Sequence, residues 1–201
     1  MATGRGPMFK LVLLGEVGVG KTSLFFRLRD NVFNQHIKTT TGIDSCSKTV
    51  TAGDVQVTFC VWDTAGVERF RTLTRNYYRS AHISVLIYSL DDPSSLHFLP
   101  KWIDDTKDFA PNALKVLVGN KADLASKVPE DNVKDFASIY NCDMVFWVSA
   151  KTGEGIDDAL IKIAEKMLDT LKREECQGGL FDEKDRKRLT DESSGGSGCG
   201  C

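Results

Sequence analysis

The stretch Gly15-Glu16-Val17-Gly18-Val19-Gly20-Lys21-Thr22 follows the apolar run Phe9–Leu14, which is predicted to be a buried strand. It fits the spacing G-x-x-x-x-G-K-[ST], with a helix-like segment after it. The glycines allow a loop whose amides point at phosphate oxygens, the lysine neutralises the outer phosphates, and the threonine hydroxyl is a ligand for Mg²⁺. A chance match in a chain of this length is expected about 1% of the time. The residues predicted to bind nucleotide here are Glu16, Val17, Gly18, Val19, Gly20, Lys21, Thr22 and Ser23.

Around this loop, short apolar runs alternate with longer amphipathic stretches, which is typical of a mostly parallel sheet covered by helices. Further strands are predicted at Phe59–Trp62, His82–Leu90, Leu114–Val118 and Met144–Val148, and a hairpin joins Ser47–Val50 to Val55–Trp62. The last helix is the clearest, because Ile156, Leu160, Ile163, Met167 and Leu171 recur at helical spacing. The charged residues Asp104, Asp105, Lys107 and Asp108 are interpreted as a solvated helix face.

A second phosphate-site motif follows the predicted strand that ends near Trp62. Asp63-Thr64-Ala65-Gly66 places a carboxylate where it can approach Mg²⁺ and a glycine where a backbone amide can approach a terminal phosphate. D-x-x-G is a weak signal alone and a strong one after the phosphate loop. We therefore expect Thr22 and Asp63 to lie at a magnesium site.

Two further motifs follow strands and predict a base-recognition site at the carboxyl ends of the sheet. They are Asn120-Lys121-Ala122-Asp123 and Ser149-Ala150-Lys151. The Asp123 carboxylate can accept hydrogens from N1 and N2 of guanine, a pair that adenine does not offer. The two lysine stems can lie against the ring faces, and the Ala150 amide can donate to guanine O6. These motifs favour GTP and GDP as ligands.

Composition argues against two classes of binding partner. The chain has 201 residues, 26 Lys plus Arg and 28 Asp plus Glu, and a formal net charge of −2. This balance argues against a nucleic-acid partner and against membrane binding by charge alone. The cysteines Cys46, Cys60, Cys142 and Cys176 are widely spaced and are expected to be reduced thiols. Cys199 and Cys201 form a final Cys-Gly-Cys.

Over residues 8–172 the chain resembles the Ras-like small GTPases and, within them, the Rab family. The narrower resemblance rests on Glu68–Thr74, Tyr77–Ala81 and Thr40–Asp44. It implies an α/β fold, the P-loop NTPase G domain, with a six-stranded mostly parallel sheet, one antiparallel strand and helices on both faces. The expected G domain spans 8–175, and 176–201 is a flexible tail.

The resemblance also implies roles for residues and regions. Thr40 is the second Mg²⁺-binding hydroxyl and contacts the γ-phosphate, Phe33 stacks on the guanine edge, and Lys21, Thr40 and Gly66 form the catalytic set. The loops near 35–45 and 64–80 are ordered by GTP and released by GDP. The implied partners are an exchange factor, a TBC-type activator, Rab escort protein, GDI and effectors, in membrane traffic.

Three residues depart from the family pattern. Val67 stands where the family has a glutamine that orients the attacking water, a loss that typically costs about 10²-fold or more. Val17 replaces a small or short polar residue, and it either crowds the reacting phosphate or points away. Ser45 replaces a common phenylalanine of the apolar patch that effectors contact together with Trp62 and Tyr77. We expect slow intrinsic hydrolysis and altered effector choice.

The end of the chain predicts lipidation. From residue 173 onward there are five basic and seven acidic residues, so the tail is not polybasic. The resemblance implies two geranylgeranyl groups, on Cys199 and Cys201, because two lipids give stable anchoring where one gives marginal binding. The expected location is cytoplasmic, on the cytosolic face of an intracellular membrane.

The sequence leaves one alternative function open and argues against another. A non-hydrolysing GTP-dependent effector-binding module would use the same site residues without turnover. A P-loop nucleotide kinase would need an arginine-rich lid and an acceptor site, for which the sequence offers no candidates.

Overall fold

The computed structural model describes residues 6–35, 43–64 and 77–176, without the side chains of the last two. The chain divides into two compact units, Met1–Ala164 and Glu165–Cys201. The first unit contains the whole sheet, and the described part of the second is the end of the last helix. In the described part of the chain, no helix is both long and apolar enough to cross a bilayer.

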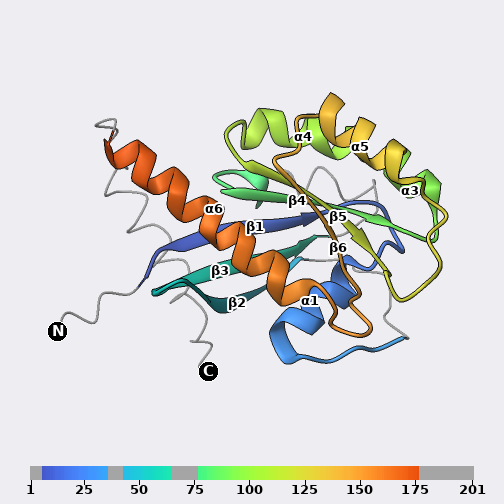
Figure 1. Ribbon diagram of the computed structural model, residues 1–201, viewed down its shortest axis with the longest axis horizontal. Coiled ribbons are helices and arrows are strands. Elements are labelled where there is room, and N and C mark those ends of the chain that lie inside the picture. The colour runs from blue at the N-terminus through green and yellow to red at the C-terminus, as the bar shows by residue number, and fades with distance from the viewer. Residues whose placement is uncertain (1–5, 36–42, 65–76, 177–201) are drawn as a thin grey trace, which may run out of the picture. The chain divides into compact units, whose positions relative to one another are not determined.

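Six strands form one sheet in the order β2-β3-β1-β4-β5-β6 (Figure 1). Only β2 and β3 pair antiparallel, through the predicted hairpin, and the other neighbours pair parallel. The predicted fold class is therefore confirmed. The strands are β1 Met8–Leu14, β2 Ile43–Ala52, β3 Val55–Thr64, β4 Ile83–Ser89, β5 Leu114–Asn120 and β6 Met144–Trp147.

Helices cover both faces of the sheet (Figure 1). The helices in the described residues are α1 Lys21–Asp30, α3 Pro93–His97, α4 Pro100–Phe109, α5 Glu130–Ile139 and α6 Ile156–Cys176, which begins in the first unit and ends in the second. Successive residues of a strand point to opposite faces, so β1 supplies both layers of the core. Leu11 and Leu13 lie with apolar residues of α1 and of the start of α6, such as Leu24 and Ile163. Val12 belongs to the cluster on the other face.

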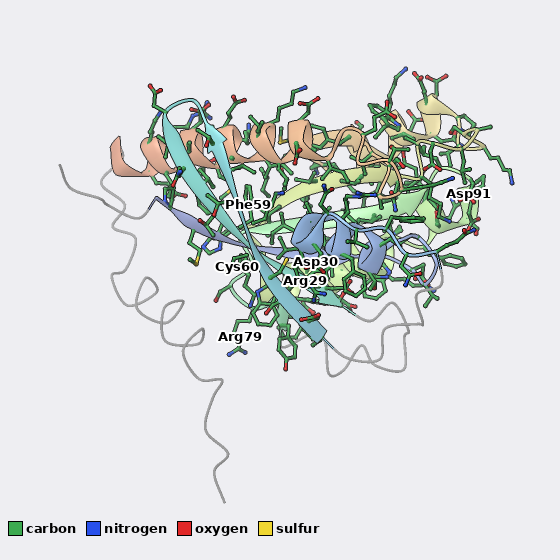
Figure 2. All side chains as sticks on the ribbon, turned by 90° about the horizontal axis from the view of Figure 1, so that it is seen from below. Arg29, Asp30, Phe59, Cys60, Arg79 and Asp91 are labelled. Atoms are coloured by element: carbon green, nitrogen blue, oxygen red, sulfur yellow. The ribbon has the colours of Figure 1, made fainter. Side chains whose placement is uncertain are left out.

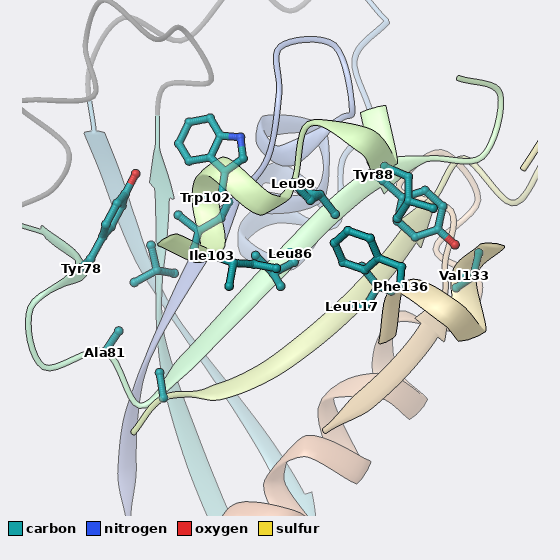
Figure 3. Close-up of a cluster of buried hydrophobic side chains, with 14 of the residues drawn as sticks. Tyr78, Ala81, Leu86, Tyr88, Leu99, Trp102, Ile103, Leu117, Val133 and Phe136 are labelled. Atoms are coloured by element: carbon teal, nitrogen blue, oxygen red, sulfur yellow. The ribbon is translucent and has the colours of Figure 1, made fainter. Parts of the chain in front are cut away.

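That second cluster packs α4 and α5 against the sheet. Trp102 and Leu99 are at most 1% exposed and lie with Leu86, Leu117 and Phe136 (Figure 3). Fully burying a side chain of this size contributes roughly 1.5–3 kcal/mol relative to leaving it exposed. This packing fixes the carboxyl ends of β4 and β5 relative to α4.

The expectation of a solvated charged face on α4 is wrong at Asp105. Asp104 and Lys107 are exposed and form an ion pair at 2.9 Å, but Asp105 is only 6% exposed. The reason is helical spacing, because Asp105 lies three residues after Trp102 and therefore on the buried side of the helix. Burial here is tolerated because Asp105 has an interaction partner.

The sheet topology places the functional motifs at one edge. β1, β3, β4, β5 and β6 run in the same direction, so their carboxyl ends meet there. β1 lies between β3 and β4, with one chain crossover to each side. In open α/β sheets, ligands bind at this kind of switch point. The loop after β1 is the glycine-rich stretch identified in the sequence.

Three scattered cysteines lie in the described residues. Cys46, Cys60 and Cys142 are free, half-buried thiols. Burial raises the pKa of Cys46 and of Cys142 to about 11. Their thiolate fraction at neutral pH is therefore very small, and no reactive cysteine is indicated among them.

Candidate functional site

The loop between β1 and α1 needs glycine at two positions. At Gly20, φ is 92° and a Cβ atom would lie 2.3 Å from Asn120 Nδ2. At Gly15, φ is 144° and a Cβ atom would lie 2.3 Å from the Ile87 carbonyl oxygen. Gly20 is also the N-cap of α1, without a side-chain cap, so the first turn of the helix offers backbone N–H groups to a ligand.

Lys21 is folded back over this loop. It is 5% exposed, and its Nζ donates to the carbonyl oxygens of Gly15 and Glu16, each at 2.8 Å. Burial lowers the pKa of Lys21 to about 8, against the opposing effect of the Asp63 and Glu16 charges. The protein alone therefore stabilises this cation poorly, and phosphate oxygens would supply the missing negative charge.

Asp63 and Thr22 meet beside the lysine. The Thr22 hydroxyl donates to Asp63 Oδ2 at 2.7 Å. Asp63 is 1% exposed, and its Oδ1 accepts no hydrogen bond from the described residues. Burial raises the pKa of this carboxyl, while the Thr22 hydroxyl and the Lys21 charge act against that rise. A buried oxygen without a donor beside a hydroxyl fits a Mg²⁺ site, because Mg²⁺ prefers hard oxygen ligands.

Asn120, the last residue of β5, joins the phosphate loop to the loop after β6. Its Nδ2 donates to the Val19 carbonyl at 2.8 Å, and its Oδ1 accepts from the Ala150 amide at 3.1 Å. The side chain is 1% exposed. The Ala150 amide, which we expect to reach guanine O6, therefore already has an acceptor inside the protein.

Asp123 is held by the second base motif. Ser149 Oγ donates to Asp123 Oδ1 at 2.6 Å, and Lys151 Nζ lies 3.5 Å from Oδ2. The Ser149 hydrogen bond is the main cause that lowers the pKa of Asp123, with the Lys151 charge adding to it. The carboxylate is therefore ionised at neutral pH and ready to accept hydrogen bonds.

Most of these residues line one cavity of about 490 Å³. The structure thus brings both sequence-predicted ends of the site together, the phosphate loop and the two base motifs. Predicted residues in the lining are Val17, Gly18, Gly20, Lys21, Thr22, Ser23, Phe33, Asn120, Lys121, Asp123, Ala150 and Lys151.

Four predicted residues in the described part of the chain support the cavity without lining it. Asp63 accepts a hydrogen bond from the lining residue Thr22. The Val19 carbonyl accepts from Asn120, and Ser149 donates to Asp123. Glu16 accepts from Trp102 Nε1 of α4 at 3.1 Å. Thr40, Gly66 and Val67, together with Cys199 and Cys201, lie outside the described residues.

Four lining residues were not expected from the sequence. They are Asn34, Gln35, Asp91 and Leu124. Asp91 could have been predicted from the sequence, because it follows the carboxyl end of β4, and ligands of open α/β sheets bind beyond the carboxyl ends of strands. Its Oδ1 accepts from Ser89 Oγ and lies 3.2 Å from Lys121 Nζ, and these partners lower the pKa of Asp91. The other three carried no chemical signal beyond their place beside Phe33 and Asp123.

Comparisons with known proteins show which family the chain is similar to. The Ras family model matches residues 10–169. The chain is similar to the Ras-related protein Rab-1C of Dictyostelium discoideum, 38% identical over 160 residues, 78% of this chain and 79% of that protein. It is 35% identical to human Ras-related protein Rab-15 over 177 residues, 87% of this chain and 83% of that protein. It is 37% identical to Ras-related protein Rab-18 of Lymnaea stagnalis over 164 residues, 80% and 81% of the two chains.

Proposed function

The chain belongs to the Ras family of small GTPases, with Rab proteins as its relatives, and we propose that it is a switch in membrane traffic whose intrinsic hydrolysis is slow. As a member of this family it is an enzyme that hydrolyses GTP to GDP. The observation that carries the nucleotide-binding part of the proposal is one cavity that joins the phosphate loop to two base-recognition motifs.

In this proposal the nucleotide is bound at both ends of the cavity by residues with different tasks. Lys21 holds the outer phosphate oxygens with a buried positive charge. Asp123 accepts the hydrogens of guanine N1 and N2, and Ser149 fixes its orientation. Phe33 lines the same cavity and is placed to cover the base. Thr40 and Gly66 are proposed to contact the γ-phosphate.

Mg²⁺ fits the residues beside the phosphate loop, because Asp63 Oδ1 is buried without a hydrogen-bond donor. Thr22 and Thr40 would hold the ion through their hydroxyls, and Asp63 would face it as a carboxylate. When bound, Mg²⁺ neutralises charge on the phosphate oxygens. The Thr22–Asp63 hydrogen bond keeps both groups oriented toward that position.

Val67 is the basis for proposing slow hydrolysis. A valine side chain has no amide to orient water or to donate to the transferred phosphoryl group. Val17 adds to the effect, since it lines the cavity with half of its side chain exposed. We expect Val67→Gln to accelerate single-turnover hydrolysis of bound GTP by about 10²-fold.

Val17→Ser is the second arm of this hydrolysis experiment and should give a smaller gain. Nucleotide release is measured in parallel, so that a change in binding is not taken for a change in chemistry. If neither substitution accelerates phosphate release, the explanation of slow hydrolysis is wrong. A TBC-type activator, which supplies its own arginine and glutamine, should still stimulate the unsubstituted chain.

The proposed partner surface lies at 35–45 and 64–80, where an exchange factor, a TBC-type activator and effectors would bind. Within it, Ser45 pairs with Trp62 across β2 and β3. The Trp62 and Tyr77 rings lie 5.6 Å apart and Tyr77 is 39% exposed. The serine leaves this surface with less apolar area than a phenylalanine would. Ser45→Phe should therefore change which Rab effectors bind, as measured by pull-down with GTP-loaded protein.

Membrane attachment is proposed through Cys199 and Cys201, with 8–175 as the G domain and 176–201 as the tail. Rab escort protein would present the chain for geranylgeranylation and GDI would extract it. Serine at both positions should leave nucleotide binding intact and move the protein from the membrane to the cytosolic fraction. Retention of that double variant on membranes would refute the assignment.

A further inference from the structure

Arg27 of α1 reaches across to the loop that is expected to contact guanine. Its Nε donates to the Ala150 carbonyl at 2.9 Å, and its Nη2 donates to the Lys151 carbonyl at 2.6 Å. The side chain is half-buried, and its Cδ lies 3.9 Å from where a Cβ atom of Gly153 would be. One guanidinium therefore fastens two successive peptide groups of this loop.

The remaining nitrogen of Arg27 holds a second segment. Nη1 donates to the Asn31 carbonyl at 2.9 Å and to Asn31 Oδ1 at 3.0 Å. Asn31 is the C-cap of α1 in the left-handed region, with φ 55°, and it lies two residues before Phe33. Arg27 thus connects α1 to two segments whose residues line the nucleotide cavity.

Neighbouring Ser149 has anchors of its own. The Ser149 amide donates to the Glu154 carbonyl at 3.0 Å, and the Gly153 amide donates to the Ser149 carbonyl at 2.8 Å. Ser149 is fully buried and holds Asp123 through its hydroxyl. Loss of Arg27 would therefore leave the Ala150 and Lys151 carbonyls without their donor and loosen this loop. The Ala150 amide would keep its hydrogen bond to Asn120, and Ser149 would keep the Asp123 carboxylate in place.

We propose that Arg27 is a positioning residue for base recognition, which fixes Ala150 and Lys151 relative to the helix that begins at phosphate-binding Lys21. The inference rests on the proposed guanine-nucleotide function. The planar fork of arginine is required, because four acceptors at different directions cannot be met by the single ammonium group of lysine. The base contact that depends on Arg27 is the expected hydrogen bond from the Ala150 amide to guanine O6.

The test measures the rate at which the full chain releases each of three nucleoside diphosphates, in competition with a fluorescent nucleotide. GDP carries both base contacts, IDP lacks the 2-amino group that Asp123 would accept from, and 6-thio-GDP replaces O6 with a weakly accepting sulfur. In Arg27→Lys and Arg27→Met, release of GDP and of IDP should each accelerate by about tenfold, as expected for losing hydrogen bonds from a charged donor. Release of 6-thio-GDP should accelerate clearly less, because that ligand makes a weaker O6 contact.

Arg29→Lys is the matched control on the same helix. Arg29 is exposed and forms ion pairs with Asp30 and Asp44, and none of the three lines the cavity. Arg29 and Asp30 are labelled in Figure 2. The control variant should leave all three release rates unchanged. Thermal unfolding of each variant shows whether the fold is intact at the assay temperature.

Equal acceleration for all three nucleotides would overturn the proposal, because general loosening does not distinguish O6. Unchanged release of GDP in both Arg27 variants would also overturn it. Failure of the underlying function is recognised separately and before any variant is made. In that case the unsubstituted chain would release GDP and ADP at the same rate, and the inference would fall with it.

Discussion

The phosphate end and the base end of the cavity differ in how well the protein alone satisfies their charges. At the phosphate end, burial lowers the pKa of Lys21 to about 8, and Asp63 keeps a buried oxygen that accepts no hydrogen bond from the described residues. At the base end, Asp123 is bound by Ser149 and faces Lys151. One end has buried charges that need a ligand, and the other has polar groups that already bind one another.

This difference assigns different tasks to the two ends. Nucleotide phosphates bring negative charge to a buried cation, so binding there gains a large electrostatic contribution in a site of low dielectric. The base meets groups that must exchange one hydrogen bond for another, so the net gain per bond is small. Affinity should therefore come mainly from the phosphate end and selectivity mainly from the base end.

The largest expected effect is loss of the buried cation. Lys21→Met should weaken binding of GDP by about a thousandfold, as expected when one partner of a buried charge interaction is removed. Without nucleotide, the same variant should unfold at a higher temperature, because it no longer buries a charge. The measurements are competition with a fluorescent nucleotide and thermal unfolding of the nucleotide-free protein. A variant that loses affinity and stability together would contradict the contrast between the two ends.

The next largest effect tests selectivity. Asp123→Asn removes the acceptor for guanine N1 and N2 and should reduce the preference for GDP over ADP by about a hundredfold. A xanthine diphosphate should gain affinity, because the new amide can donate to its O2. Asp104→Asn, which changes an exposed carboxylate on α4, is the matched control. If preference for GDP survives in Asp123→Asn, base recognition does not depend on this carboxylate.

Both ends were predictable from the sequence because their residues are close together along the chain. Gly15–Thr22 and Asn120–Asp123 are contiguous, and each follows a strand whose apolar pattern is visible. The parallel topology then brings the motifs to one edge. Spacing alone was therefore sufficient to name most of the cavity lining.

What could not be predicted depends on contacts between distant residues or on burial. Arg27 contacts a loop 123 residues away, and nothing in its neighbourhood in the sequence indicates that partner. The lowered pKa of Lys21 depends on how much of the side chain is covered, which spacing does not reveal. Asp105 was wrongly predicted to be solvent-exposed for the same reason, since its burial depends on how α4 packs on the sheet.

A smaller effect distinguishes the role of Asp63 from that of Lys21 at the phosphate end. Asp63→Asn keeps the size of the side chain and an acceptor for the Thr22 hydroxyl, but it removes the carboxylate that fits Mg²⁺. In the unsubstituted chain, Mg²⁺ should slow release of GDP, and in the variant this slowing should fall by about tenfold. Release with and without a chelator measures it. Equal slowing by Mg²⁺ in both proteins would exclude Asp63 from the metal site.

The smallest expected effect is the uptake of a fraction of a proton when GDP binds. Because burial lowers the pKa of Lys21 to about 8 from 10.5, the unfolded chain holds more protons at this group between those values. Lys21 therefore makes the stability of the nucleotide-free protein rise with pH in that window. Phosphate binding should raise the lysine pKa again, so GDP binding at pH 8 should take up about half a proton per site.

Calorimetry in two buffers of different ionisation enthalpy measures this uptake. Asp123→Asn should leave it unchanged, because Asp123 has a lowered pKa and stays ionised throughout this range. Lys21→Met should abolish it, at nucleotide concentrations high enough to overcome its weaker binding. An uptake that followed Asp123 instead of Lys21 would place the unsatisfied charge at the base end and reverse the comparison.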